Sequence, residues 1–145
     1  MFHLRSLILG TCAAALMAGG ALAKSDIIVA MQLEPPHLDP TSAAAGAIDS
    51  VLYSNVFEGL TRFMGDGSVV PGLAESWEVS EDGLTYTFKL HSGVTFHDGT
   101  TMDAEDVKFS LDRIGTEDSA NAQKALFSAI SEVTVIDPMT VEIKL

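Results

Sequence analysis

The chain has 145 residues, the length of about one domain, and its 20 acidic against 8 basic side chains give a formal net charge of -12. Nucleic-acid binding is not expected, because a phosphate backbone is bound through lysine and arginine side chains that neutralise it. The acidic residues are spread along the chain without a long run of like charges, which is typical of a solvated surface. An acidic cleft that attracts cationic ligands is the alternative.

Residues 1–23 are predicted to be a cleaved secretory signal peptide. Arg5 provides the positive start, the stretch from Leu7 to Met17 is apolar, and Ala21-Leu22-Ala23 is a small-x-small cleavage site. The apolar stretch is shorter than the about 20 residues that a membrane-spanning helix needs. The single cysteine, Cys12, lies in this stretch, so the mature chain is expected to contain no disulfide. An uncleaved anchor and a lipid attached to Cys12 are the alternatives.

The first elements after the leader are predicted to be a strand, a stiff loop and a helix. The segment from Asp26 to Met31 is mostly apolar and rich in β-branched side chains, which indicates a buried strand. Three prolines between positions 35 and 40 exclude a helix there and keep the chain extended. From Ala47 to Leu60, apolar side chains recur every four positions, and Gly59 predicts the end of this helix.

The middle of the chain is predicted to be β-structure separated by tight turns. The expected strands are 60–64, 69–70, 76–79, 84–90 and 94–96. Glu81-Asp82-Gly83 predicts the turn of a hairpin. In the second strand of this hairpin, Tyr86, Phe88 and Leu90 alternate with polar residues and therefore share one face.

Helical periodicity returns from Asp103 to Ile114. Asp103 is a predicted N-cap, Arg113 lies in the last turn, and Gly115 predicts the end. The predicted buried stripe of this helix consists of Val107, Leu111 and Ile114.

A second helix is predicted from Ala120 to Ile130, with Leu126, Phe127 and Ile130 buried. A hairpin of strands 133–136 and 141–145 follows, and its last strand is expected to be an unpaired edge, as in a truncated domain.

The predicted mature chain lacks the usual catalytic motifs. It has no cysteine, no Gly-x-Ser-x-Gly, no His-Glu-x-x-His and no glycine-rich phosphate loop. The spacing of His37, His91 and His97 matches no common metal site, so neither a metal nor a cofactor is expected. Glu34 and Asp39 could form the carboxylate pair of a hydrolase, although two acids in a proline-rich loop are weak evidence for catalysis.

Several segments resemble the family 5 extracellular solute-binding proteins, which serve ABC importers. The marker segment runs from Pro71 to Leu90 and includes Pro71-Gly72-Leu73-Ala74-Glu75-Ser76-Trp77. The similarity continues through Gly93 to Thr100 and from Asp103 to Leu111. Upstream, Glu34 to Pro40 and Asn55 to Leu60 also resemble family segments in the same order.

This resemblance implies an α/β, two-lobed periplasmic-binding-protein fold of which only the N-terminal portion is present. After the signal peptide, residues 24–58 would begin the large N-terminal lobe with its first strand. Residues 59–145 would form the small α+β subdomain of hairpins and helices, truncated at the C-terminus. The second lobe, which closes over the ligand by hinge motion, has no counterpart in this sequence.

The resemblance also implies that the loop after the first strand faces the ligand cleft. Glu34, Pro35 and His37 are therefore the candidate ligand-binding residues, and no catalytic residue is expected. A proline-stiffened loop loses little conformational entropy when it binds a ligand. An ordinary rigid connector is the alternative. Four aromatic residues of the family segments are assigned to packing: Trp77, Tyr86, Phe88 and Phe96.

The implied function is that of a monomeric periplasmic receptor, without enzymatic activity, that delivers a peptide or related solute to an ABC permease. Relatives of this type bind dipeptides, oligopeptides, nickel complexes, heme or sugars, and this part of the sequence does not select among them. A secreted carboxylate-based hydrolase and an envelope interaction module without a small ligand are the competing hypotheses.

Overall fold

The computed structural model describes residues 26–42, 45–53 and 55–145, so the predicted signal peptide lies outside the described residues. The contacts divide the chain into two compact units, Met1–Ala30 and Met31–Leu145. The boundary predicted at residues 58 and 59 stays a prediction. The helices and strands are α1 (Gly46–Leu52), β1 (Thr61–Phe63), β2 (Val69–Pro71), β3 (Ala74–Val79), β4 (Thr85–Leu90), α2 (Ala104–Gly115), the 3₁₀ helix η1 (Lys124–Phe127), β5 (Glu132–Asp137) and β6 (Thr140–Lys144).

A four-stranded antiparallel sheet with the strand order β3-β4-β6-β5 is the centre of the second unit. The predicted hairpin 76–90 is confirmed as β3–β4, and Phe88 lies opposite both Trp77 and Val141. The ring centroids of Trp77 and Phe88 are 6.2 Å apart, and those of Tyr86 and Phe88 are 6.4 Å apart. Packing roles are therefore supported for these three aromatic residues, whereas Phe96 is exposed.

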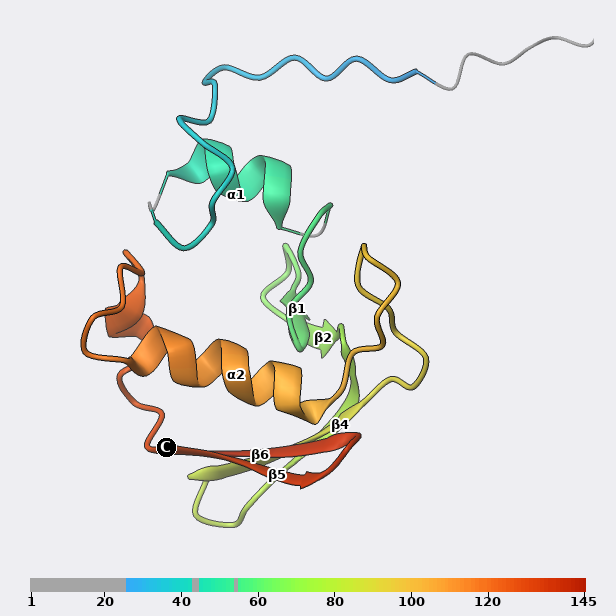
Figure 1. The fold of residues 1–145 in the computed structure, drawn as a ribbon, viewed down its shortest axis with the longest axis vertical. Coiled ribbons are helices and arrows are strands. Elements are labelled where there is room, and N and C mark those ends of the chain that lie inside the picture. The colour runs from blue at the N-terminus through green and yellow to red at the C-terminus, as the bar shows by residue number, and fades with distance from the viewer. Residues whose placement is uncertain (1–25, 43–44, 54) are drawn as a thin grey trace, which may run out of the picture. The chain divides into compact units, whose positions relative to one another are not determined.

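The predicted helix 103–114 is confirmed as α2, which lies along the apolar face of the sheet (Figure 1). Val107 is buried and Leu111 packs against the core that the helix shares with the sheet. The buried residues of this core are Ala74, Leu90, Met102, Ala104, Val107, Val133, Val141 and Ile143. Ile114 of the predicted stripe is only half-buried.

The prediction of an unpaired final strand is wrong. β6 pairs with β4 on one side and with β5 on the other, so it lies inside the sheet. The physical reason is its alternating sequence. Val141 and Ile143 fill the apolar face, and this pattern is best satisfied between two neighbouring strands. Among the described strands of this sheet, β3 and β5 are the edges.

A small β-ribbon of β1 and β2 precedes the sheet, as the strand predictions 60–64 and 69–70 anticipated. The pairing of the two strands continues beyond the Thr61–Pro71 pair, into residues 59–60 and 72–73. The Gly72 N–H donates to the Leu60 carbonyl at 3.1 Å, and the Leu73 N–H donates to the Gly59 carbonyl at 2.9 Å. This ladder leads the chain directly into β3.

The predicted strand 26–31 is absent from the described residues. The side chains of Ile27, Ile28 and Val29 are 86%, 95% and 71% exposed. A single strand is not stable without a neighbour to which its backbone can hydrogen-bond, and no described strand pairs with this segment.

The helix predicted from Ala47 to Leu60 is shorter than expected, because α1 ends at Leu52. Ile48 and Leu52 are buried, but Val56, the next position of the apolar stripe, is 44% exposed. Tyr53 has an extended backbone, and its bridge to Phe57 replaces the helical path. The spacing of apolar residues in the sequence therefore extends to Leu60, but the helix forms only where these residues are buried.

The helix predicted from Ala120 to Ile130 is also wrong, since only η1 forms there. The Ser119 and Asn121 side chains accept backbone N–H groups two residues ahead, which favours turns over a helix. Leu126, predicted to be buried, is 76% exposed. The strand predicted at 94–96 is reduced to an isolated bridge between Thr95 and Thr101.

Candidate functional site

The three predicted ligand-binding residues lie in one loop without regular secondary structure. Glu34 and His37 are exposed, and Pro35 is half-buried. Leu33 and Leu38 in the same loop are also exposed, so the loop offers both polar and apolar groups. These positions agree with an accessible binding loop, but no ligand contact tests the assignment, which stays a prediction.

The His37 ring is held by hydrogen bonds on both of its nitrogens. The Asp39 N–H donates to Nδ1 at 3.2 Å, and the Ser42 hydroxyl oxygen lies 3.2 Å from Nε2. A backbone N–H can only donate, so Nδ1 is the acceptor. In a neutral imidazole the proton then lies on Nε2, which donates to Ser42.

Asp39 closes the turn that follows His37. Its carboxylate accepts the Thr41 N–H at 2.8 Å and the Thr41 hydroxyl at 2.7 Å. These two bonds from Thr41, the hydroxyl first, lower the pKa of the Asp39 carboxyl because they stabilise its charged form. The Asp39 carboxylate is therefore engaged within its own turn.

The turn is tied to a distant part of the chain through Thr41. The Thr41 carbonyl accepts the Ala122 N–H at 2.9 Å. Asn121 stabilises the segment around Ala122, because its side-chain oxygen accepts the Gln123 N–H at 2.8 Å. The loop that contains the predicted ligand-binding residues is thus fixed at its C-terminal end by a backbone bond to residues before η1.

Ser42 and Thr41 were missed as members of this loop network. The signal was the pattern Asp39-Pro40-Thr41-Ser42, since an aspartate followed two residues later by a hydroxyl residue is typical of Asx and ST turns. The same pattern recurs at Asp66 and Ser68 and at Asp98 and Thr100.

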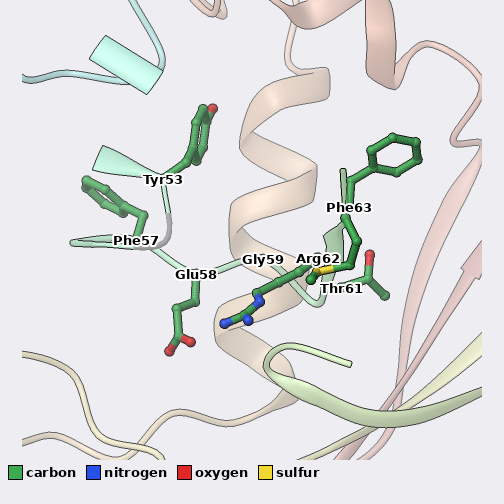
Figure 2. Close-up of a pocket in the computed structure, with 8 residues that line it drawn as sticks. Tyr53, Phe57, Glu58, Gly59, Thr61, Arg62 and Phe63 are labelled. Atoms are coloured by element: carbon green, nitrogen blue, oxygen red, sulfur yellow. The ribbon is translucent and has the colours of Figure 1, made fainter. Parts of the chain in front are cut away.

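An open hollow of about 590 Å³ lies between the end of α1 and the β1–β2 ribbon. Figure 2 shows the Tyr53 and Phe57 rings on one side and the Phe63 ring on the other, with the Glu58 and Arg62 side chains below them. Its complete lining is Tyr53, Phe57, Glu58, Gly59, Thr61, Arg62, Phe63 and Met64. The sequence did not indicate this hollow, because the helix predicted from Ala47 to Leu60 includes Tyr53 and Phe57, whereas α1 ends at Leu52.

The histidines outside the loop are not gathered into a metal centre. Within residues 26–42, 45–53 and 55–145, no three His, Cys, Asp or Glu side chains are grouped closely enough to hold a metal ion. His91 Nδ1 lies 4.0 Å from Glu75 Oε2, and both side chains are about half exposed. Among the same residues, no helix is long and apolar enough to span a bilayer.

Comparison with known proteins gives one consistent relationship. The chain is 36% identical over 141 residues to the glutathione-binding protein GsiB of Pectobacterium atrosepticum, covering 97% of this chain and 27% of that protein. It resembles NikZ from Campylobacter jejuni, solved in complex with Ni(L-His), with a TM-score of 0.67 and 34% identity over 78% of this chain and 22% of that one. It also resembles the oligopeptide-binding protein AppA from Bacillus subtilis, solved with a nonapeptide, with a TM-score of 0.72 and 26% identity over 77% and 22%.

These structural neighbours are two-lobed periplasmic binding proteins, so the predicted fold class is confirmed for the part that this chain represents. The chain spans about a quarter of the length of the relatives that it matches. The model of the bacterial extracellular solute-binding proteins, family 5, matches residues 68–145, from the β1–β2 ribbon to the last strand. The chain belongs to the family 5 bacterial extracellular solute-binding proteins.

Proposed function

We propose that this chain is part of the periplasmic substrate-binding component of an ABC importer, which captures a small peptide and delivers it to the membrane permease. The observation that supports this most is the similarity to a glutathione-binding protein over 97% of the chain. The fold supports it independently, because the described sheet and helix superpose on receptors solved with peptide and metal–amino-acid ligands.

Glutathione, or a tripeptide of similar size and charge, is the proposed ligand. Glu34 supplies an exposed carboxylate for a ligand ammonium group, and Pro35 keeps its backbone in a fixed extended path. His37 adds a polar ring whose orientation is set by two hydrogen bonds. These residues form one wall of the proposed site.

The proposed receptor is an exported, monomeric protein that works without a cofactor and without catalysis. The predicted signal peptide at residues 1–23 supports export, and the family consists of extracellular binding proteins. The permease subunits of the importer are the proposed macromolecular partner.

Calorimetric titration of the full-length protein with glutathione, trialanine and a nickel–histidine complex tests this function. We expect saturable binding of glutathione and a loss of about tenfold in affinity for Glu34→Gln, because one charge-assisted hydrogen bond is removed. Glu81→Gln, at an exposed turn position between β3 and β4, is the matched control and should bind normally.

Three outcomes would contradict the proposal in whole or in part. Binding of none of the three ligands would remove the proposed receptor function. Hydrolysis of glutathione or of a glycoside, abolished by Glu34→Gln, would support the competing hydrolase. Normal binding by Glu34→Gln would preserve the receptor but place its ligand elsewhere.

A further inference from the structure

Residues 37–42, in the loop that contains the proposed ligand-binding residues, are closed into a hydrogen-bonded ring by the contact between the His37 imidazole and the Ser42 hydroxyl. The Asp39 N–H donates to His37 Nδ1, and His37 Nε2 lies within hydrogen-bond distance of the Ser42 hydroxyl. Within this ring the Asp39 carboxylate accepts the Thr41 N–H and the Thr41 hydroxyl, and these two bonds are the main cause of its lowered pKa. Each group has the partner that its chemistry requires only when His37 is neutral and protonated on Nε2.

The ring is held on a fixed base. Thr41 lies inside it, donates twice to the Asp39 carboxylate, and is bonded through its carbonyl to the Ala122 N–H at 2.9 Å. The start of the loop is stiffened by Pro35 and Pro36. The orientation of His37 therefore depends on a turn that Asp39 organises.

We propose that Asp39 is a positioning residue of the ligand-binding loop, which presents His37 as the neutral Nε2–H form, and that protonation of His37 opens the ring and weakens ligand capture. This inference rests on the proposed function, because it assumes that Glu34, Pro35 and His37 contact the solute. It adds Asp39, which acts through His37, and it adds a dependence of the ligand affinity on pH.

Protonation changes the ring at one defined bond. A protonated Nδ1 becomes a donor that faces the Asp39 N–H, also a donor, so this hydrogen bond is lost. The Asp39 carboxylate also attracts a positive charge on His37, and this attraction favours an imidazole orientation in which Nδ1 no longer faces the Asp39 N–H. The segment around Ala122 also contains Glu117, Asp118 and Lys124, and the Lys124 ammonium group donates to the Thr116 and Glu117 carbonyls.

The first test measures the ring itself, without any ligand. Two-bond ¹H–¹⁵N correlation spectra of the full-length protein report the protonated nitrogen of each imidazole, and His37→Gln identifies the His37 signals. We expect the Nε2–H form for His37 at neutral pH and its loss in Asp39→Ala. The Nδ1–H form, or a mixture of forms that Asp39→Ala leaves unchanged, would overturn the proposal.

The second test measures the affinity for glutathione between about pH 7.5 and about pH 5, the range in which imidazoles titrate. The wild-type affinity should fall by about three- to tenfold, as expected for the loss of one hydrogen bond. Asp39→Ala should already be weakened by this factor at the upper pH, and Asp39→Asn, which keeps an acceptor oxygen, should recover most of it. His37→Gln should show no step with pH.

The control is His91→Gln, which removes an exposed histidine near Glu75 and should retain the wild-type pH profile. An affinity that is independent of pH in the wild type, or a step that disappears in His91→Gln, would overturn the inference. If glutathione does not bind at all, the proposed function fails, while the spectra still decide whether the ring exists.

Discussion

At the residue scale, Gly72 is the position where the absence of a side chain matters most. A Cβ atom placed there would lie 2.5 Å from the Gly59 carbonyl oxygen and 3.1 Å from the Leu60 carbonyl oxygen. These atoms belong to the backbone that pairs with residues 72–74, so they cannot move aside as a flexible side chain would.

Gly72→Ala is therefore expected to lower the free energy of unfolding by about 1–3 kcal/mol, the usual cost of an atom forced into a packed region. Urea unfolding followed by Trp77 fluorescence measures this change. Gly65→Ala is the control, because nothing lies within 4 Å of a Cβ at that position. Equal effects of the two substitutions would contradict the close approach as the reason for glycine.

Lys108 links α2 to the edge strand β5. Its ammonium group donates to the Val133 carbonyl at 2.7 Å and to the Asp112 carboxylate at 2.8 Å. Lys108→Met keeps most of the apolar stem but removes both bonds, so we expect a loss of about 1 kcal/mol in unfolding free energy.

Asp112→Asn separates the two bonds of Lys108 in the same urea measurement. It weakens the exposed i,i+4 ion pair and leaves the bond to Val133 intact, so its cost should stay below about 0.5 kcal/mol. If Asp112→Asn costs as much as Lys108→Met, the bond to the edge strand contributes nothing.

At the element scale, α2 begins at a complete capping box. The Asp103 carboxylate accepts the Glu105 N–H at 2.8 Å, and the Asp106 carboxylate accepts the Asp103 N–H at 2.9 Å. Asp103→Ala should cost about 1 kcal/mol, because backbone N–H groups of the first turn lose their partner. Asp103→Ser, which restores a capping oxygen, should recover most of this loss in thermal unfolding; no recovery would argue against the cap.

The elements differ in how well local sequence predicted them. α2 was predicted closely because a cap, a buried stripe and a terminating residue all agree within its own segment. Segment 120–130 has an apolar period but also the turn-forming side chains of Ser119 and Asn121, and these determined the outcome. The periodicity of apolar residues alone does not show which of these side chains will be buried against another element.

At the scale of the whole molecule, aspartate turns recur along the chain and introduce a common response to acid. The pKa values of four exposed carboxyls are lowered mainly by hydrogen bonds from neighbouring hydroxyl and backbone N–H groups, those of Asp39, Asp66, Asp82 and Asp98. A carboxyl with a lowered folded-state pKa stabilises the fold above its unfolded value of 3.8, and this contribution is lost as the pH falls through the folded-state pKa.

We therefore expect the urea midpoint of the wild type to fall as the pH is lowered below about 4. The double substitution Asp66→Asn and Asp98→Asn should reduce the difference between the midpoints at about pH 7 and about pH 3. Asp118→Asn, at an exposed position outside these turns, is the control. An unchanged acid response in the double variant would show that the turns do not contribute to it.

The residues of the candidate site were predicted from the sequence, but the hydrogen bonds between them were not. The resemblance selected Glu34, Pro35 and His37, and the structure places them in one accessible loop. The partners of His37 were not predicted as a network, because the bond from Asp39 and the contact with Ser42 depend on how the chain folds back after Pro40. The bond between Thr41 and Ala122 joins residues too far apart in sequence for any local pattern to indicate.

The sequence by itself determined the family, the α2 helix and the two hairpins of the sheet, because each depends on side chains close together in the chain. Tertiary structure alone decided that β6 lies inside the sheet, that α1 ends at Leu52, and that the 26–31 segment is not a strand in the described chain. These outcomes depend on which surfaces and backbone partners are available, and such partners come from distant residues. For the same reason, the loop that surrounds His37 became a defined hydrogen-bonded unit only in three dimensions.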